Sequence, residues 1–287
     1  MENHVYREAI QLRRQRLGLR GKRPKNGQLF VLAVAIVTLL GGASCRKQVA
    51  ETARVIDVGD AEGAAEKVAE ADKLYVQRGD LAKLRQAVAL VRQAQVADYG
   101  SYEAAWKLAE FDYYLGEHTT DERERDDAFR EGIEAGKTAV RLQDGKPEGH
   151  FWLGANYGGS AEYSTLASLA SVEDIRRGME TVLKLDEGFQ GGSAYMVLGQ
   201  LYLQAPRILG GNHQKALEYL EKGLRFGNNN ALLRLHLAEA YHAVNRDQDA
   251  RRQIEFLLSM KPDPNYLPEY KEAVEKAKNL REKLKGS

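Results

Sequence analysis

Cysteine and proline are the scarce residues of this chain, which has one cysteine and six prolines among 287 residues. A single cysteine excludes a disulfide within the chain and a metal site built from several of its thiolates. The scarcity of proline, together with many Ala, Leu, Glu, Lys and Arg residues, favours helix. The net charge is only +1, and no Lys/Arg stripe interleaved with aromatic residues occurs, which argues against a nucleic-acid-binding protein.

Long apolar runs are also missing. The uncharged segment Leu29–Leu40 has about twelve residues, which is short of the roughly 20 that a membrane-spanning helix needs. Basic residues such as Arg20 and Lys22 precede this segment, and the small residues Gly41–Ser44 follow it. The order of basic, apolar and small residues is typical of a secretory signal peptide, which we expect over residues 1–44.

The only cysteine, Cys45, follows directly. The sequence Gly42-Ala43-Ser44-Cys45 resembles the lipobox of bacterial lipoproteins, although the commoner form has a leucine three places before the cysteine and the nearest one here is Leu40. The resemblance implies a diacylglycerol on Cys45 and a lipid anchor in the membrane, with residues 45–64 as a tether. The alternative is a signal anchor with an inert Cys45. The residues after Cys45, Arg46-Lys47, do not include the aspartate that is associated with retention in the inner membrane of some bacteria. We therefore expect the protein in the outer membrane.

Residues 65–287 have the apolar period of helices, and one phrase recurs along them. A leucine and a small residue are followed three places later by an aromatic: Leu153-Gly154 with Tyr157, Leu198-Gly199 with Tyr202, and Leu237-Ala238 with Tyr241. Leu108-Ala109 is a looser copy in which Asp112 takes the place of the aromatic. This pattern predicts an all-α, tetratricopeptide-like array of helical hairpins, an α-solenoid, after the lipoprotein signal.

Each phrase is followed by a second amphipathic helix whose small and apolar residues should face the first, as Ala216, Leu220 and Gly223 do in one unit. The central small residues are 45, 45 and 39 residues apart, counted from Ala109 to Gly154, Gly199 and Ala238. The standard repeat has about 34 residues. We therefore expect insertions between helices at 117–127, 158–171 and 205–212. A last helix over 268–284 should cap the exposed end of the array.

Two phrases carry a narrower resemblance. Residues 150–158 read HFWLGANYG, and residues 205–212 read APRILGGN before a further helix. In this order they resemble the T-component family of tripartite ATP-independent periplasmic (TRAP) transporters. The resemblance implies a non-enzymatic periplasmic lipoprotein that works beside a substrate-binding P-component in solute uptake. It also implies a homo-oligomer, since at least one family member is a trimer around a pore.

In a tetratricopeptide array, the first helix of each hairpin lines the concave groove. When the central Gly or Ala of each phrase is counted as position eight, the side chains at positions five, nine and twelve point into this groove. Such a groove would be largely apolar here, and contiguous exposed apolar surface marks a binding face. We expect it to take an apolar-bodied organic acid, a lipid-like ligand or a partner's helix. The alternative is that the insertions or the last helix fill the groove, so that these residues are core. The predicted groove residues are Trp106, Glu110, Tyr113, Phe151, Met196, Gln200, Leu203, Leu235, Glu239 and His242, with Ala155 and Gly158 at the remaining positions.

A second candidate site is the loop that contains Pro206, Gly210, Gly211 and Asn212. The two glycines permit positive φ and a close backbone approach, and Asn212 can cap the next helix. The loop is either a turn with a helix cap or a partner-binding loop that exposes backbone N–H groups.

Features of an enzyme are missing. The six histidines lack the spacing of a zinc-protease site, and no nucleophile elbow, phosphate loop or dinucleotide fingerprint occurs. The carboxylates mostly have Lys or Arg three or four places away, as on solvated helix faces. We therefore expect no enzyme activity, cofactor or metal. The leading hypothesis is an accessory component of a TRAP transporter, and the alternatives are a tetratricopeptide lipoprotein that scaffolds an envelope complex and a carrier of a soluble ligand.

Overall fold

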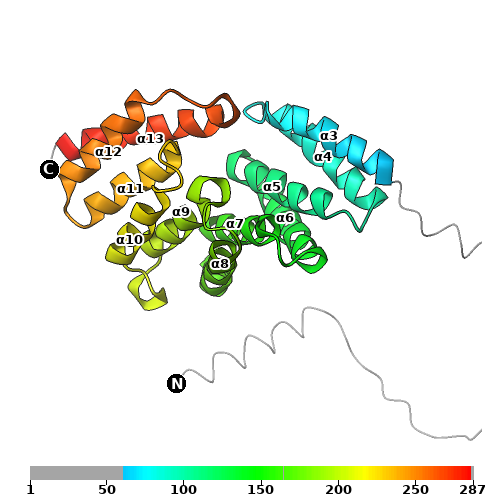
Figure 1. The fold of residues 1–287 in the computed structure, drawn as a ribbon, viewed down its shortest axis with the longest axis horizontal. Coiled ribbons are helices and arrows are strands. Elements are labelled where there is room, and N and C mark those ends of the chain that lie inside the picture. The colour runs from blue at the N-terminus through cyan, green and yellow to red at the C-terminus, as the bar shows by residue number, and fades with distance from the viewer. Residues whose placement is uncertain (1–60, 164, 286–287) are drawn as a thin grey trace, which may run out of the picture. The chain divides into compact units, whose positions relative to one another are not determined.

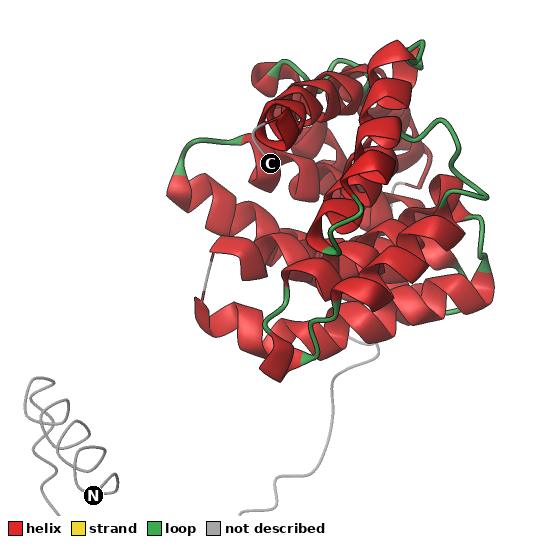
Figure 2. Ribbon diagram, turned by 90° about the vertical axis from the view of Figure 1, so that its left-hand side faces the viewer, coloured by secondary structure: helices red, strands yellow, loops and turns green. Residues whose placement is uncertain are grey.

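A computed structural model describes residues 61–163 and 165–285 of the chain. Within these residues every regular element is a helix, and there is no strand (Figure 2). The predicted all-α hairpin array is therefore confirmed. The predicted signal peptide, Cys45 and most of the tether lie outside the described residues.

Five helical hairpins and a last helix follow one another along the described chain. They are α3 (Ala61–Tyr75) with α4 (Leu81–Ala97), α5 (Tyr102–His118) with α6 (Glu122–Leu142), α7 (Pro147–Tyr163) with α8 (Thr165–Leu185), α9 (Phe189–Gln204) with α10 (His213–Gly223), α11 (Ala231–Ala243) with α12 (Asp247–Ser259), and α13 (Leu267–Lys285). Two short 3-10 turns, η1 (Arg207–Leu209) and η2 (Pro264–Tyr266), lie in the loops before α10 and α13. In Figure 1, α5, α7, α9 and α11 lie on the inner side of the curve and α6, α8, α10 and α12 on the outer side.

Short polar side chains start several of the helices. Asp80, Ser101, Asp121, Asn212 and Asn230 each stand one residue before a helix and accept a hydrogen bond from an N–H of its first turn. Such caps satisfy donors that have no partner inside the helix, and each stabilises a helix by about 1 kcal/mol. The local sequence therefore largely determines where these helices begin.

The small residue in the middle of each inner helix lets the outer helix approach, as predicted. A Cβ on Gly154 would lie 2.5 Å from Cε of Met179 in α8, and one on Gly199 would overlap Leu220 in α10. Ala238, at the same position of α11, is completely buried. Larger side chains at these positions would push the two helices of a hairpin apart.

Two of the three predicted insertions are wrong. Residues 117–127 hold the end of α5, the cap Asp121 and the first turns of α6, and residues 158–171 belong mainly to α7 and α8. The extra residues lengthen the helices, since α6 and α8 each have 21 residues. Only 205–212 is a loop between the helices of a hairpin. Spacing alone counts the added residues and does not tell whether they continue a helix.

The predicted last helix is present as α13, and it packs on α11 and α12. Its Ala273 and Ala277 are completely buried and share an apolar core with Ile254 of α12. At the other end of the array, α3 includes residues 61–64, which the sequence assigned to the tether, and Ala64 is in the core. Among the described residues, no helix combines the length and apolar character needed to cross a membrane.

Candidate functional site

Most of the predicted groove residues are half-buried on the inner helices. These are Trp106, Glu110 and Tyr113 of α5, Met196, Gln200 and Leu203 of α9, and Glu239 and His242 of α11. Their partial exposure is what a contact surface needs, and the three helices that carry them lie on the inner side of the curve (Figure 1). We call these eight residues the inner face.

Phe151 and Leu235, two other predicted groove residues, are core residues. Phe151 is 5% exposed, and its ring centroid lies 4.9 Å from that of Trp152 and 5.3 Å from that of Phe189 in the next hairpin. Leu235 is completely buried in the same core cluster as the alanines of α13. Both positions are covered by a neighbouring element, so neither side chain can meet a ligand without repacking. Ala155 is also buried.

Two carboxyl groups on α5 are electrostatically unusual. Burial raises the pKa of Glu110 from 4.5 to about 7, against the lowering effect of Lys107 and Arg78. Burial, followed by the charge of Glu162, also raises the pKa of Glu117 to about 7. Near neutral pH these side chains therefore exchange between a carboxylate and a neutral carboxyl that can donate a hydrogen bond.

The last helix brings further charges to the carboxyl end of α5. His118 Nε2 lies 3.7 Å from Glu272 of α13, and Lys276 lies 2.6 Å from the same carboxylate. The contact with His118 lowers the pKa of Glu272 to about 2. Burial opposes protonation of His118, but Glu272 and the Tyr114 carbonyl together raise its pKa. The last helix therefore contacts α5 at His118, one turn beyond Tyr113 of the inner face.

An ion pair that the sequence analysis missed joins the first hairpin to the last helix. Arg78, in the turn between α3 and α4, is 4% exposed and donates from Nε and Nη2 to the carboxylate of Glu269, each at 2.8 Å. Nη2 also donates to the carbonyl of Asn265 at 2.6 Å, and the guanidinium lies 4.9 Å from the centroid of the Tyr75 ring. We call this pair the clasp. Its two members are 191 residues apart in the sequence, and no local sequence pattern predicts such a pair.

Two polar residues of the inner face are held by neighbours. Glu239 shares a hydrogen bond at 2.8 Å with Nδ1 of His236, and His242 Nδ1 lies 2.7 Å from Asp247. Glu110 and Gln200 form no side-chain hydrogen bond within the described part of the chain.

The predicted loop is an ordered turn. Leu209 and Gly211 donate their N–H groups to the carbonyl of Pro206, and Gly210 donates to Arg207. Asn212 donates to the carbonyl of Tyr202 at 2.7 Å, and its side chain caps α10. Gly210 has a φ of 93°, and a Cβ on Gly211 would overlap the Ala205 carbonyl. The N–H groups of Leu209, Gly210, Gly211 and Asn212 are therefore used within the turn and on Tyr202, and Asn212 caps α10. A role of the loop in partner binding stays a prediction.

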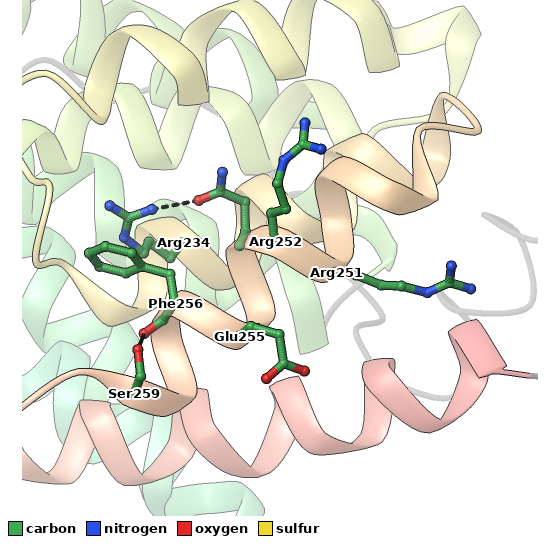
Figure 3. A pocket seen from close by; sticks show the side chains of 7 residues that line it. Arg234, Arg251, Arg252, Glu255, Phe256 and Ser259 are labelled. Carbon is green, nitrogen blue, oxygen red and sulfur yellow. Dashed lines mark hydrogen bonds between the residues drawn. The ribbon is translucent and has the colours of Figure 1, made fainter.

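A surface hollow lies on α11 and α12, away from the predicted sites (Figure 3). Arg234, 5% exposed, donates to Asn228 and Gln253, and its guanidinium lies 3.5 Å from the centroid of the Phe256 ring. These contacts tie the turn before α11 to α12, so the buried guanidinium has a structural role. Within the described ranges, no three His, Cys, Asp or Glu side chains come together as metal ligands would.

Comparison with solved structures gives the class of protein first. The thermophilic TPR protein TTC0263 of Thermus thermophilus aligns with a TM-score of 0.55 at 20% identity, over 74% of this chain and 98% of its own. PilF of Pseudomonas aeruginosa aligns with a TM-score of 0.50 at 19% identity, over 79% and 94%. The fold is thus a tetratricopeptide-type array. No curated protein matches the chain.

The particular family follows from the sequence. The model of the TRAP transporter T-component family matches residues 118–285, which is more than half of the chain, and the chain belongs to this family. The match includes both phrases on which the resemblance is based and begins at the last residue of α5. A T-component is an accessory, periplasmic-side component of a transporter.

Proposed function

We propose that this chain is a non-enzymatic, lipid-anchored T-component that binds the substrate-binding component of a TRAP transporter. The observation that carries the proposal is the family match over residues 118–285. Stacked hairpins present a rigid, extended surface, and arrays of this kind typically act through such surfaces. The test is titration of the purified full chain with the substrate-binding component, by calorimetry. A saturable heat of binding with one-to-one stoichiometry supports the proposal, and the absence of any heat of binding at the highest soluble concentrations contradicts it.

The anchor is the diacylglycerol on Cys45, after removal of residues 1–44, and residues 45–64 form the tether to the helical body over 65–287. A diacyl chain stabilises membrane attachment by about 0.8 kcal/mol per buried methylene, which favours stable membrane association, with the outer membrane as the destination. Intact-mass measurement of the chain from its own cells tests this. Cleavage before Cys45 with added lipid mass is expected, and a mature chain that retains residues 1–44 contradicts it.

The inner face binds an apolar-bodied ligand with a polar end. Trp106, Tyr113, Met196 and Leu203 supply apolar contact, and Glu110 and Gln200 supply hydrogen bonds. Because Glu110 has a pKa of about 7, its neutral form can donate to the carboxylate of an organic acid. Binding of such an acid should therefore strengthen as the pH falls below about 7.

Fluorescence provides the test for this ligand class. Trp152→Phe leaves Trp106 as the only tryptophan, so titration with fatty or aromatic acids reports on the inner face. A saturable shift of the emission that disappears in Trp106→Phe, with Trp152 retained, supports the assignment. No shift in either variant with millimolar acid contradicts a small-molecule site.

The alternative is a tetratricopeptide scaffold for another envelope complex, and the likeness to TPR structures fits it equally. The two differ in their partners. A T-component purifies with transporter components, whereas a scaffold purifies with an envelope complex that contains none of them.

A further inference from the structure

The two ends of the described array meet where α13 approaches α5 and the turn between α3 and α4 (Figure 1). The apolar face of α13 packs on α11 and α12, where Ala273 and Ala277 share a core cluster with Ile254. Among the described residues, the buried apolar side chains of α3 and α4, such as Leu84, belong to a different cluster that includes none from α13. Polar side chains therefore make the main contacts between the two ends.

Two ion pairs cross this junction. The clasp joins Arg78 to Glu269 in the first turn of α13. Three residues further along, Glu272 lies 3.7 Å from Nε2 of His118, the last residue of α5. Residues three apart lie on one face of a helix, so α13 turns a row of carboxylates toward the other end of the array. We call the junction the seam, and its members are Arg78, Glu110, Glu117, His118, Glu269 and Glu272.

The carboxyl groups of Glu110 and Glu117 belong to the seam although neither forms a side-chain hydrogen bond within the described ranges. Burial raises the pKa of each to about 7, and the charges of Glu269 and Glu272 on α13 add to the effect at Glu110 and Glu117 respectively. The two carboxyls of α5 thus face the two carboxylates of α13.

The fixed cations of the seam already have partners. Besides the clasp, Lys107 pairs with Asp72 at 2.6 Å, and Lys276 pairs with Glu272 at 2.6 Å. Ionisation of Glu110 or Glu117 therefore adds a negative charge that has no cation of its own. The titratable and charged groups facing Glu110 are Lys107, Asp72, Tyr75, Arg78, Tyr266 and Glu269, and those facing Glu117 and His118 are Tyr113, Tyr114, Glu162, Tyr163, Glu272 and Lys276.

We propose that the seam is a pH-sensitive closure, which holds the two ends of the array together in mild acid and lets them separate as the pH rises to about 7 and above. In mild acid Glu110 and Glu117 are neutral, and His118 carries the positive charge that pairs with Glu272. Rising pH places two negative charges beside Glu269 and Glu272 and removes the charge of His118. All three changes weaken the contact, and separation of the ends gives solvent access to Glu110 of the inner face.

All three groups bind their protons more tightly in the closed seam than in water. The two glutamates have a pKa of 4.5 in water and of about 7 in the seam, so closure is fully favoured below about pH 4.5 and weakens progressively up to about pH 7. Burial lowers the pKa of His118, but the contact with Glu272 and the Tyr114 carbonyl raise it above 6.5 overall. The contribution of His118 is therefore lost as the pH rises above about 6.5.

A distance measurement across the seam tests this closure. Spin labels are placed on the full chain with Cys45→Ser, which has no other cysteine, at the exposed positions Gln86→Cys of α4 and Glu275→Cys of α13. Electron–electron double resonance should show one short distance at about pH 5.5 and a second, longer one at about pH 8. The ratio of the open to the closed population should rise by at least about tenfold. The matched label pair, Gln86→Cys with Glu134→Cys of α6, does not cross the seam and should keep its distance.

Two sets of variants show which groups cause the change. Glu110→Gln with Glu117→Gln should keep the short distance at about pH 8, because the amides stay neutral. Glu103→Gln removes an exposed carboxylate from the start of the same helix and should open like the wild-type chain. Each single variant should open less than the wild-type chain, and this comparison provides the test if circular dichroism shows that the double variant does not fold.

The closure is overturned if no longer distance develops at about pH 8 in the wild-type chain, or if the longer distance persists undiminished when the two glutamates are replaced. An equal change in the matched label pair would show general loosening of the fold and would also overturn it. The measurement needs no partner, so its outcome is independent of the proposed function.

Discussion

At the scale of single residues, Asp112 is the least expected side chain of the core. It is completely buried, and neither carboxylate oxygen has a hydrogen-bond partner. Burial, followed by the charge of Glu131, raises its pKa well above the usual range, which favours the neutral form in the folded protein. The repeat pattern places Asp112 where the other units have an aromatic residue.

Asp112→Asn should therefore stabilise the protein. The amide has the same shape and needs no proton to stay neutral, whereas the carboxyl must take up a proton on folding. Because the folded pKa is raised, this penalty grows as the pH rises above the unfolded value. The gain should be about 1 to 3 kcal/mol near pH 8 and smaller near pH 5. Urea unfolding at both pH values measures it, and a loss of stability near pH 8 would contradict the assigned burial.

Glu110 gives a second pH-dependent effect. Its pKa is raised on folding from 4.5 to about 7, so the neutral form is favoured in the folded state. This group therefore weakens the fold above pH 7, and the loss disappears as the pH falls toward 4.5. Glu110→Gln should raise the melting temperature near pH 8 and reduce its change between about pH 5 and pH 8. An unchanged pH profile would show that Glu110 is not desolvated.

At the scale of elements, the backbone at the start of α9 is the most constrained junction in the described chain. Gln190, Gly191 and Gly192 all have positive φ, with 79° at Gly192. A Cβ on Gly192 would also lie 2.7 Å from the carbonyl oxygen of Gly223, at the end of α10. The start of α9 thus packs backbone against backbone on the end of α10, which sets the distance between the two helices of this hairpin.

Gly192→Ala should therefore lower the free energy of unfolding by at least about 2 kcal/mol, because the side chain adds both backbone strain and overlap. Gly145→Ala is the matched control, since nothing lies within 4 Å of the added Cβ. It should change stability by less than about 0.5 kcal/mol. Equal effects of the two substitutions in urea unfolding would argue against the close packing of the start of α9 on the end of α10.

The elements also show which parts of the fold were predictable. The hairpins could be predicted from Gly154, Gly199 and Ala238, because a small residue at each position lets the opposite helix pack closely. The lengths of α6 and α8 did not follow, because spacing between repeats does not distinguish a longer helix from a loop. Phe151 and Leu235 were assigned to the groove by position within the repeat, but the next hairpin and α13 cover them. The position within the repeat therefore predicts the direction of a side chain, but it does not predict whether another element of the chain buries that side chain.

At the scale of the whole molecule, the clasp joins the first hairpin to the last helix. Its pairing of Arg78 with Glu269 could not be predicted, because 191 residues separate the two and each sits in an ordinary polar stretch. The same limit applies to the site. Local sequence located the turn at 205–212 and the inner helices, while the raised pKa values of Glu110 and Glu117 depend on elements that fold around them.

Arg78→Met should lower the free energy of unfolding by roughly 3 kcal/mol, because it leaves a carboxylate without its buried partner. Hydrogen exchange at the start of α13 should also become faster, since the clasp holds this end of the helix. Arg85→Met is the control, because its pair with Glu124 is exposed, and it should lose only about 0 to 1 kcal/mol. A loss for Arg78→Met no greater than that of the control would refute the clasp.

Native mass spectrometry of the complex extracted from its own membrane tests whether this chain is a lipid-anchored component of a TRAP transporter. We expect a mass that contains the chain cleaved before Cys45, its lipid and a substrate-binding component. A complex of the chain with other envelope proteins and no transporter component would refute this assignment.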